Sequence, residues 1–295
     1  MLDRRHRARL SWLRHSSTHR LPPRLARARS RARHVVASAA VGLAALLVAA
    51  GAGAQERPAR ILDKPNLNGI WQAVGTAHWN LEPHSAEALD EFWQLGAIAA
   101  IPAGQGVVEG GEIPYLPEAR ERRDANRAAW PEADPEAKCF LPGIPRANYM
   151  PYPFQIVQGD DDDILFIYEY ASANRVVHIE SHRDAPIDTW MGVSNGRWEG
   201  DTLVVETVGL NGETWLDRAG NFAGAGATVT ERFTPIDDSH MRYEATIENP
   251  AVFSRPWTIR LVLYRHVEPN AQLYEFRCIP FSERLLYKDV LPPKE

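Results

Sequence analysis

The chain has 295 residues, of which 44% are apolar and nine are Trp, and this composition excludes an intrinsically disordered protein. Residues 1–34 hold eleven Arg and one acidic residue, a net +10, so the formal charge of −5 leaves −15 on residues 35–295. A body this acidic, with only four Lys, does not suit nucleic acid or an anionic membrane surface. The composition predicts one globular domain with no nucleic-acid partner.

The N-terminal segment has the pattern of a secretory signal peptide. An Arg-rich stretch is followed by the uncharged run Val35–Ala50, and then by Ala52 and Ala54, which fit the small-residue rule for cleavage. Because this run is short and rich in Ala, it is weak as a membrane span. We therefore expect a signal peptide over residues 1–54 and a single domain over residues 55–295, periplasmic or secreted and free of the membrane after cleavage. An uncleaved membrane anchor is the alternative.

The two cysteines are interpreted in the light of export. Cys139 and Cys278 make an even count, and oxidising compartments favour disulfides. We predict that they form one disulfide, which joins the segment before the main β region to the last predicted strand. A catalytic thiol is the alternative.

The first part of the expected domain contains few strands. Residues 55–66 predict an extended arm, and residues 67–71 predict the start of a strand. Apolar residues recur at helical spacing over residues 85–100 after a Ser N-cap, and residues 117–129 predict a second, charged helix. Because the intervening stretches are rich in Pro and Gly, residues 78–150 are interpreted as a helical and loop insertion.

From residue 154 onwards the hydrophobic pattern has a period of two. Turn sequences such as Asn195-Gly196 separate the apolar runs, which is typical of antiparallel strands. The main predicted strands cover residues 154–158, 164–170, 174–181, 190–193, 202–208, 228–234, 241–247, 257–267 and 272–278. The pattern predicts an all-β protein, an antiparallel up-and-down barrel of about eight or nine strands, because closure removes exposed sheet edges.

Two resemblances agree with this architecture. Gly69-Ile70-Trp71 resembles the G-x-W motif that opens lipocalin and other calycin barrels. Four longer runs resemble an uncharacterised family of exported bacterial proteins; they are Asp134–Cys139, Pro151–Phe154, Gly196–Glu206 and Arg255–Thr258. The resemblance implies a lipocalin-like barrel and no particular chemistry.

No P-loop, dinucleotide-binding fingerprint, nucleophile elbow or HExxH motif occurs, so no cofactor is expected. The run His178-Ile179-Glu180-Ser181-His182 places three polar side chains on one face of a strand. His178 and Glu180 are close enough to share a metal ion, and His178 alone suits general acid–base catalysis near neutral pH. A solvated strand face is the third interpretation.

Tryptophans suggest where a ligand would bind. Trp190 and Trp215 lie beside turns and next to carboxylates, an arrangement that suits a barrel mouth holding a hydrophobic or aromatic molecule. Trp257 and Glu231, on predicted strands, complete the ligand-binding candidates. Plain packing of the tryptophans is the alternative.

Two classes of function stay open. The first is an exported lipocalin-like protein that binds a small hydrophobic or aromatic molecule. The second is a cofactor-free lyase, isomerase or hydrolase, in which His178 moves a proton, Asp188 or Glu206 assists it, and Arg232 stabilises negative charge. Glu206 and Glu231 each interrupt an apolar row, and burial would raise the pKa of either carboxyl group. A structural protein of the cell envelope is a third, simpler interpretation.

Overall fold

The computed structural model describes residues 59–89, 100–160 and 163–282. All of them belong to one compact unit, Arg57–Glu295. The predicted signal peptide lies outside the described residues. No helix in the described part of the chain has the length and apolar composition that a membrane-spanning helix needs.

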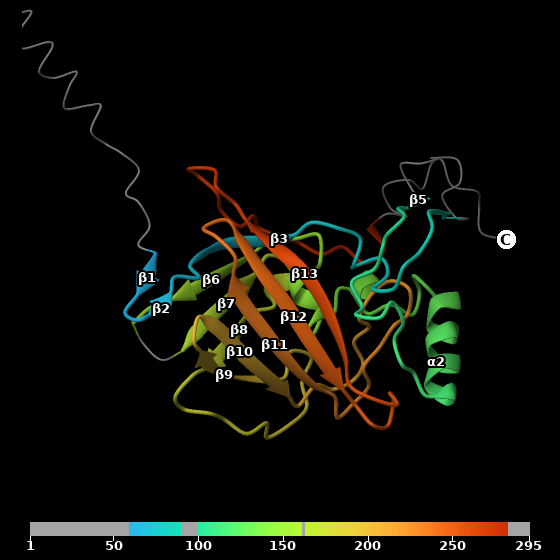
Figure 1. The fold of residues 1–295 in the computed structure, drawn as a ribbon. Coiled ribbons are helices and arrows are strands. Elements are labelled where there is room, and N and C mark those ends of the chain that lie inside the picture. Colours follow the sequence, from blue (N-terminus) through green and yellow to red (C-terminus); the bar gives the residue numbers. More distant parts are fainter. Residues whose placement is uncertain (1–58, 90–99, 161–162, 283–295) are drawn as a thin grey trace, which may run out of the picture. The chain divides into compact units, whose positions relative to one another are not determined.

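Nine strands close into one barrel (Figure 1), which confirms the predicted all-β barrel. Around the barrel they follow the order β10 (Thr202–Val208), β11 (Thr228–Pro235), β12 (His240–Glu248), β13 (Trp257–Arg265), β3 (Gly69–Ala73), β6 (Phe154–Gln158), β7 (Ile164–Tyr168), β8 (Arg175–His178) and β9 (Val193–Glu199). The last of these strands pairs again with β10 and closes the ring.

One neighbouring pair departs from the predicted meander. β8 and β9 are parallel, with Val177 opposite Ser194, whereas the other neighbouring pairs of the barrel are antiparallel. Parallel neighbours require a crossover connection, and residues 179–192 provide it by running from the end of β8 to the opposite end of the barrel. The barrel is therefore mixed rather than up-and-down throughout.

Short elements lie outside the barrel. The described part contains one α-helix, α2, which confirms the predicted charged helix and begins at a Pro, the residue favoured at the first helical position. A helix is predicted over residues 85–100, but Glu87–Ala88 form a strand there. Residues 90–99 lie outside the described part. The elements are β1 (Arg60–Ile61), β2 (Lys64–Pro65), β4 (Glu87–Ala88), β5 (Ala100–Ile101), α2 (Pro117–Ala128) and the 3₁₀ turns η2 (Glu136–Lys138), η3 (Arg146–Asn148) and η4 (Tyr170–Ser172).

The C-terminal segment is not a strand. Residues 272–278 have no ladder partner, so the prediction of a strand there is wrong. Phe276 packs against the rings of Tyr152 and Tyr170, with centroids 4.9 and 5.0 Å away. The Cys139–Cys278 disulfide is formed, as predicted, and joins this segment to the insertion.

Aromatic rings fill the centre of the barrel. Alternate residues of each strand point inward, and the ring centroids of Phe154 and Phe166 lie 6.0 Å apart. Phe233 follows at 5.3 Å from Phe166, and Tyr243 lies 5.0 Å from Phe233. All four side chains are buried. A ligand in the middle of the barrel would have to displace these rings.

The insertion covers one end of the barrel, which we call the insertion end. β3 ends there and β6 begins there, so residues 74–153 leave and return at the same end. The loops 209–227 and 249–256 connect strands at that end as well. The Nδ2 of Asn126 on α2 donates to the carbonyl of Gly220 over 3.1 Å. Figure 1 shows α2 at this end and β1 and β2 at the other.

Candidate ligand-binding site

His178 and Glu206, two of the predicted catalytic residues, point away from the barrel interior; His178 is buried and Glu206 is exposed. The neighbour of His178 on β9 is Asn195, which in turn stands opposite the exposed Glu206 on β10. Side chains at paired positions point to the same face of a sheet, so both candidates face outward. The Nδ1 of His178 donates to the Oδ2 of Asp163 over 2.9 Å.

The other two candidates are also outside the barrel. Asp188 is exposed in the crossover, and the Nη1 of Arg232 donates to the Oε2 of Glu199 over 2.8 Å. Among the residues that the structure describes, no hydrogen bond or ion pair joins any two of the four predicted catalytic residues. The metal candidate Glu180 is exposed, and the described residues contain no group of three His, Cys, Asp or Glu side chains placed to hold a metal ion.

Among the described residues, no ring contact joins any two of the predicted ligand-binding tryptophans, Trp190, Trp215 and Trp257. Trp215 and Trp257 are buried, and the ring of Trp257 packs on Phe253 at 5.4 Å. Trp190 is half-buried and stacks on Phe140 with centroids 4.9 Å apart and planes 10° from parallel. These three rings pack against the protein itself, in separate places.

Glu231 points into the barrel and is fully engaged there. Its carboxylate accepts two hydrogen bonds from Arg175, over 2.6 and 3.2 Å, and one from the hydroxyl of Tyr243 over 2.8 Å. Asn148, from η3 in the insertion, donates to the same carboxylate over 2.6 Å and accepts from the hydroxyl of Tyr168 over 2.8 Å. Through these hydrogen bonds, the carboxylate of Glu231 joins Asn148 of the insertion to residues of the barrel strands.

A buried ion cluster makes a second fastening at the insertion end. Arg146 pairs with Asp134 and Glu136, and the Nη2 of Arg218 donates to Glu136 over 2.7 Å. Burial acts to raise the pKa of Glu136, but the positive charges of Arg218 and Arg146 outweigh it and hold this pKa at about 2. Burial, with the charge of Arg218, lowers the pKa of His78 to about 4. The cluster therefore joins residues 134–146 to the 209–227 loop through fixed charges.

In the described part of the chain, a gap in the barrel wall forms one cavity. β3 pairs with β13 only over Leu263–Arg265, while the insertion pairs further along the same strand, where the amide of Arg260 donates to the carbonyl of Val107 over 2.8 Å. Leu261 and Val262 lie between these two stretches and line a cavity of about 200 Å³. We call it the wall cavity.

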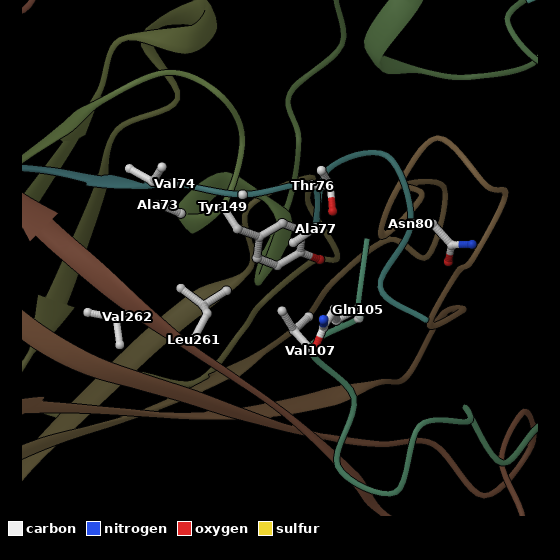
Figure 2. Close-up of a pocket in the computed structure, with 12 residues that line it drawn as sticks. Ala73, Val74, Thr76, Ala77, Asn80, Gln105, Val107, Tyr149, Leu261 and Val262 are labelled. Atoms are coloured by element: carbon white, nitrogen blue, oxygen red, sulfur yellow. The ribbon is translucent and has the colours of Figure 1, made fainter. Parts of the chain in front are cut away.

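The lining of the wall cavity is mostly apolar. Leu261 belongs to the inner face of β13, because its partner Tyr243 points inward, and Val262 belongs to the outer face, so the cavity reaches both. Figure 2 shows the ring of Tyr149 between the β13 side chains and Thr76. The lining comprises Ala73, Val74, Gly75, Thr76, Ala77, Asn80, Gln105, Gly106, Val107, Tyr149, Leu261 and Val262.

Buried hydrogen bonds hold the segment between Thr76 and Leu81 in place. The amide of Leu81 donates to the Oδ2 of Asp217 over 2.8 Å, and Asn221 donates to the same oxygen over 2.7 Å. Burial raises the pKa of Asp217 to about 6, against the lowering effect of these donors. Gly106 allows the close approach of the opposite wall, since its φ is +77° and a Cβ there would lie 2.6 Å from the nitrogen of Pro83.

Another cavity, of about 170 Å³, shares the lining residue Asn80 with the wall cavity. Its walls include Trp79 and Trp130, whose ring centroids lie 6.0 Å apart. The guanidinium of Arg218 lies over the ring of Trp79, 4.5 Å from its centroid. The full lining is Trp79, Asn80, His84, Glu87, Ile101, Arg127, Trp130, Arg218 and Ala219. We call it the tryptophan cavity.

Sequence reasoning did not single out the residues of these cavities. Trp79 and Trp130 belong to the same set of tryptophans as Trp190 and Trp215. Trp130 has Glu132 two residues away in a turn, the same signal that marked Trp190 and Trp215, so this signal could have found it.

Leu261 is one of several apolar residues on an alternating strand. The wall cavity exists because β3 stops pairing with β13 before it reaches Leu261. Where a strand stops pairing depends on its distant partner and cannot be found from local composition.

Comparison with known proteins supplies no further identification, because no family model, curated protein or solved structure matches the chain. The fold and the site define a closed, mixed nine-stranded β-barrel with a capping insertion and two cavities at the insertion end.

Proposed function

We propose that this protein binds a small hydrophobic molecule in the wall cavity. The observation that carries the proposal is a hollow of about 200 Å³ with a mostly apolar lining, the polar side chains of Thr76, Asn80 and Gln105, and the phenol of Tyr149. Ligand pockets are typically apolar, with a few placed polar groups that orient the ligand. An apolar cavity of about 150 Å³ holds benzene. A ligand with one ring and a short substituent therefore fits the cavity.

The packing of the barrel supports this location. The rings of Phe154, Phe166, Phe233 and Tyr243 occupy the interior, and Glu231 is held by Arg175. The ligand would accordingly enter through the gap in the wall instead of through the middle of the barrel, as in an open lipocalin-like cup. The geometry lends acid–base catalysis less support, because His178, Asp188, Glu206 and Arg232 make no contact with one another.

The proposed place of action is the periplasm or the extracellular space. The disulfide Cys139–Cys278 supports it, since disulfides persist mainly in oxidising compartments. The leader pattern of residues 1–54 points the same way.

Calorimetric titration with single-ring apolar compounds, such as toluene and ethylbenzene, tests the proposal. Filling the cavity with Val262→Phe is expected to weaken binding by about tenfold or more, which corresponds to about 1.4 kcal/mol. Val176→Phe is the matched control, because Val176 is an outward-facing valine on β8, 40% exposed and outside the cavity. Equal binding by both variants, or no binding by the parent protein, would contradict the proposal.

A further inference from the structure

We infer that the tryptophan cavity is a second ligand site and that it takes a single-ring aromatic carboxylate. The inference goes beyond the hydrophobic ligand of the wall cavity and does not depend on it. The two cavities share only Asn80, so substitutions can address each of them separately.

Size and ring chemistry set the first requirement. The cavity of about 170 Å³ is close to the space of about 150 Å³ that accommodates one benzene ring. Trp79 and Trp130 are half-buried, and their planes are tilted by 58°, so they offer two differently oriented ring surfaces. A flat unsaturated ring gains offset or edge contacts with such walls.

Charge sets the second requirement. The lining carries two guanidinium groups, Arg127 and Arg218, against one carboxylate, Glu87. The position over the ring of Trp79 that a cationic ligand would seek is already taken by Arg218. Arg218 is itself paired with Glu136 over 2.7 Å. Arg127, whose pair with Glu87 is exposed, is therefore the cation of the lining that can meet an anion.

Arg127 is the residue best placed to recognise the anion. It lies in the last turn of α2, and its Nη2 donates to the two oxygens of Glu87 over 2.9 and 2.8 Å. Within the described ranges, its Nε and Nη1 donate to no protein acceptor, so donors remain for a ligand carboxylate. The pair with Glu87 is about half exposed on each side, and such surface pairs are weak. Arg127 can therefore reorient toward a carboxylate at the rim while the ligand ring packs against the exposed edges and faces of the two tryptophans.

Titration of the purified protein with benzoate, benzamide and benzylamine, followed by ligand-observed NMR, tests the inference. Benzoate is expected to bind, benzamide to bind about tenfold more weakly, and benzylamine not to bind. Arg127→Met is expected to weaken benzoate binding by about tenfold, and Trp130→Leu to weaken it as well. Arg120→Met is the matched control, because Arg120 lies on the same helix in a similar exposed pair, 2.8 Å from Glu112, and does not line the cavity.

Each outcome decides the inference. It is overturned if the parent protein does not bind benzoate, if benzamide binds equally well, or if Arg127→Met binds benzoate like Arg120→Met. Val262→Phe separates the two sites, since it is expected to leave benzoate binding unchanged. Should Val262→Phe abolish benzoate binding while Arg127→Met does not, the acid occupies the wall cavity; the inference then fails and the proposed function stands.

Discussion

The Nδ2 of Asn148 lies 2.6 Å from the Oε1 of Glu231, so the insertion reaches a carboxylate inside the barrel. Glu231 already receives two hydrogen bonds from Arg175, and Asn148 also donates to the hydroxyl of Tyr243 over 3.0 Å. This contact makes the position of the insertion, and with it the shape of both cavities, depend on the barrel interior.

Asn148→Ala is therefore expected to destabilise the protein by about 3 kcal/mol. The substitution removes a donor from the buried carboxylate of Glu231 and the acceptor of the Tyr168 hydroxyl, and buried polar groups left without partners carry the full desolvation cost. Urea unfolding followed by circular dichroism measures the change. Asn174→Ala, at an exposed position, is the control and should unfold like the parent protein; equal midpoints for the two variants would refute the proposed fastening.

Arg146→Met is expected to cost about 3–5 kcal/mol, because it leaves Asp134 and part of the charge of Glu136 buried without a cation. Arg197→Met removes an exposed arginine from its pair with Glu199 and should change the unfolding free energy little. The same urea experiment compares the two. A small loss in Arg146→Met would show that the cluster does not stabilise the insertion end.

Asp217 makes a defined contribution to the pH dependence of stability. Its pKa is about 6 in the folded protein and 3.8 as an unperturbed group, so the folded state binds the proton more tightly, and the stability contributed by Asp217 falls as the pH rises from about 4 to about 6. Asp217→Asn removes this dependence. The unfolding free energy of the variant relative to the parent should therefore increase by about 3 kcal/mol across that range.

The variant-minus-parent difference is the proper measurement for Asp217, since His78 acts in the opposite direction. With its pKa lowered to about 4, His78 contributes stability that is lost as the pH falls from about 6.5 to 4. This contribution is common to the parent and to Asp217→Asn, so it cancels. Parallel stability curves for the two proteins would rule out the raised pKa of Asp217.

The disulfide closes a large loop, because Cys139 and Cys278 are separated by 139 positions in sequence. The double variant Cys139→Ser/Cys278→Ser is expected to lose up to about 5 kcal/mol, because the unfolded chain regains the entropy of the open loop. The parent protein unfolded in reductant should approach the same stability. A variant as stable as the oxidised parent would show that the C-terminal segment is held by other contacts, such as the packing of Phe276 on Tyr152.

Local sequence patterns were sufficient to predict the elements whose structure is determined by residues nearby in the chain. Period-two alternation and turn residues located most strands from Phe154 to Arg265, and a Pro at the first helical position marked α2. The prediction of a turn at Asn195-Gly196 is wrong, because both residues pair with β10 inside β9, which begins where the predicted strand 190–193 ends. The prediction of the disulfide needed only the cysteine count and the expected compartment. The predicted helix at residues 85–100 and the predicted strand at residues 272–278 were less well determined, since short amphipathic runs take the structure that their packing dictates.

The direction of each strand face was decided by the tertiary structure. Glu206 and Glu231 both interrupt apolar rows, yet Glu231 is buried and Glu206 is exposed. The reason is that closure of the barrel decides which of the two alternating sets of side chains on each strand points inward. His178 faces outward for the same reason. The parallel pairing of β8 with β9 and the gap beside Leu261 depend on where distant segments stop pairing. Sequence alone determined the class of fold, whereas long-range pairing decided which polar residues are buried and where the cavities lie.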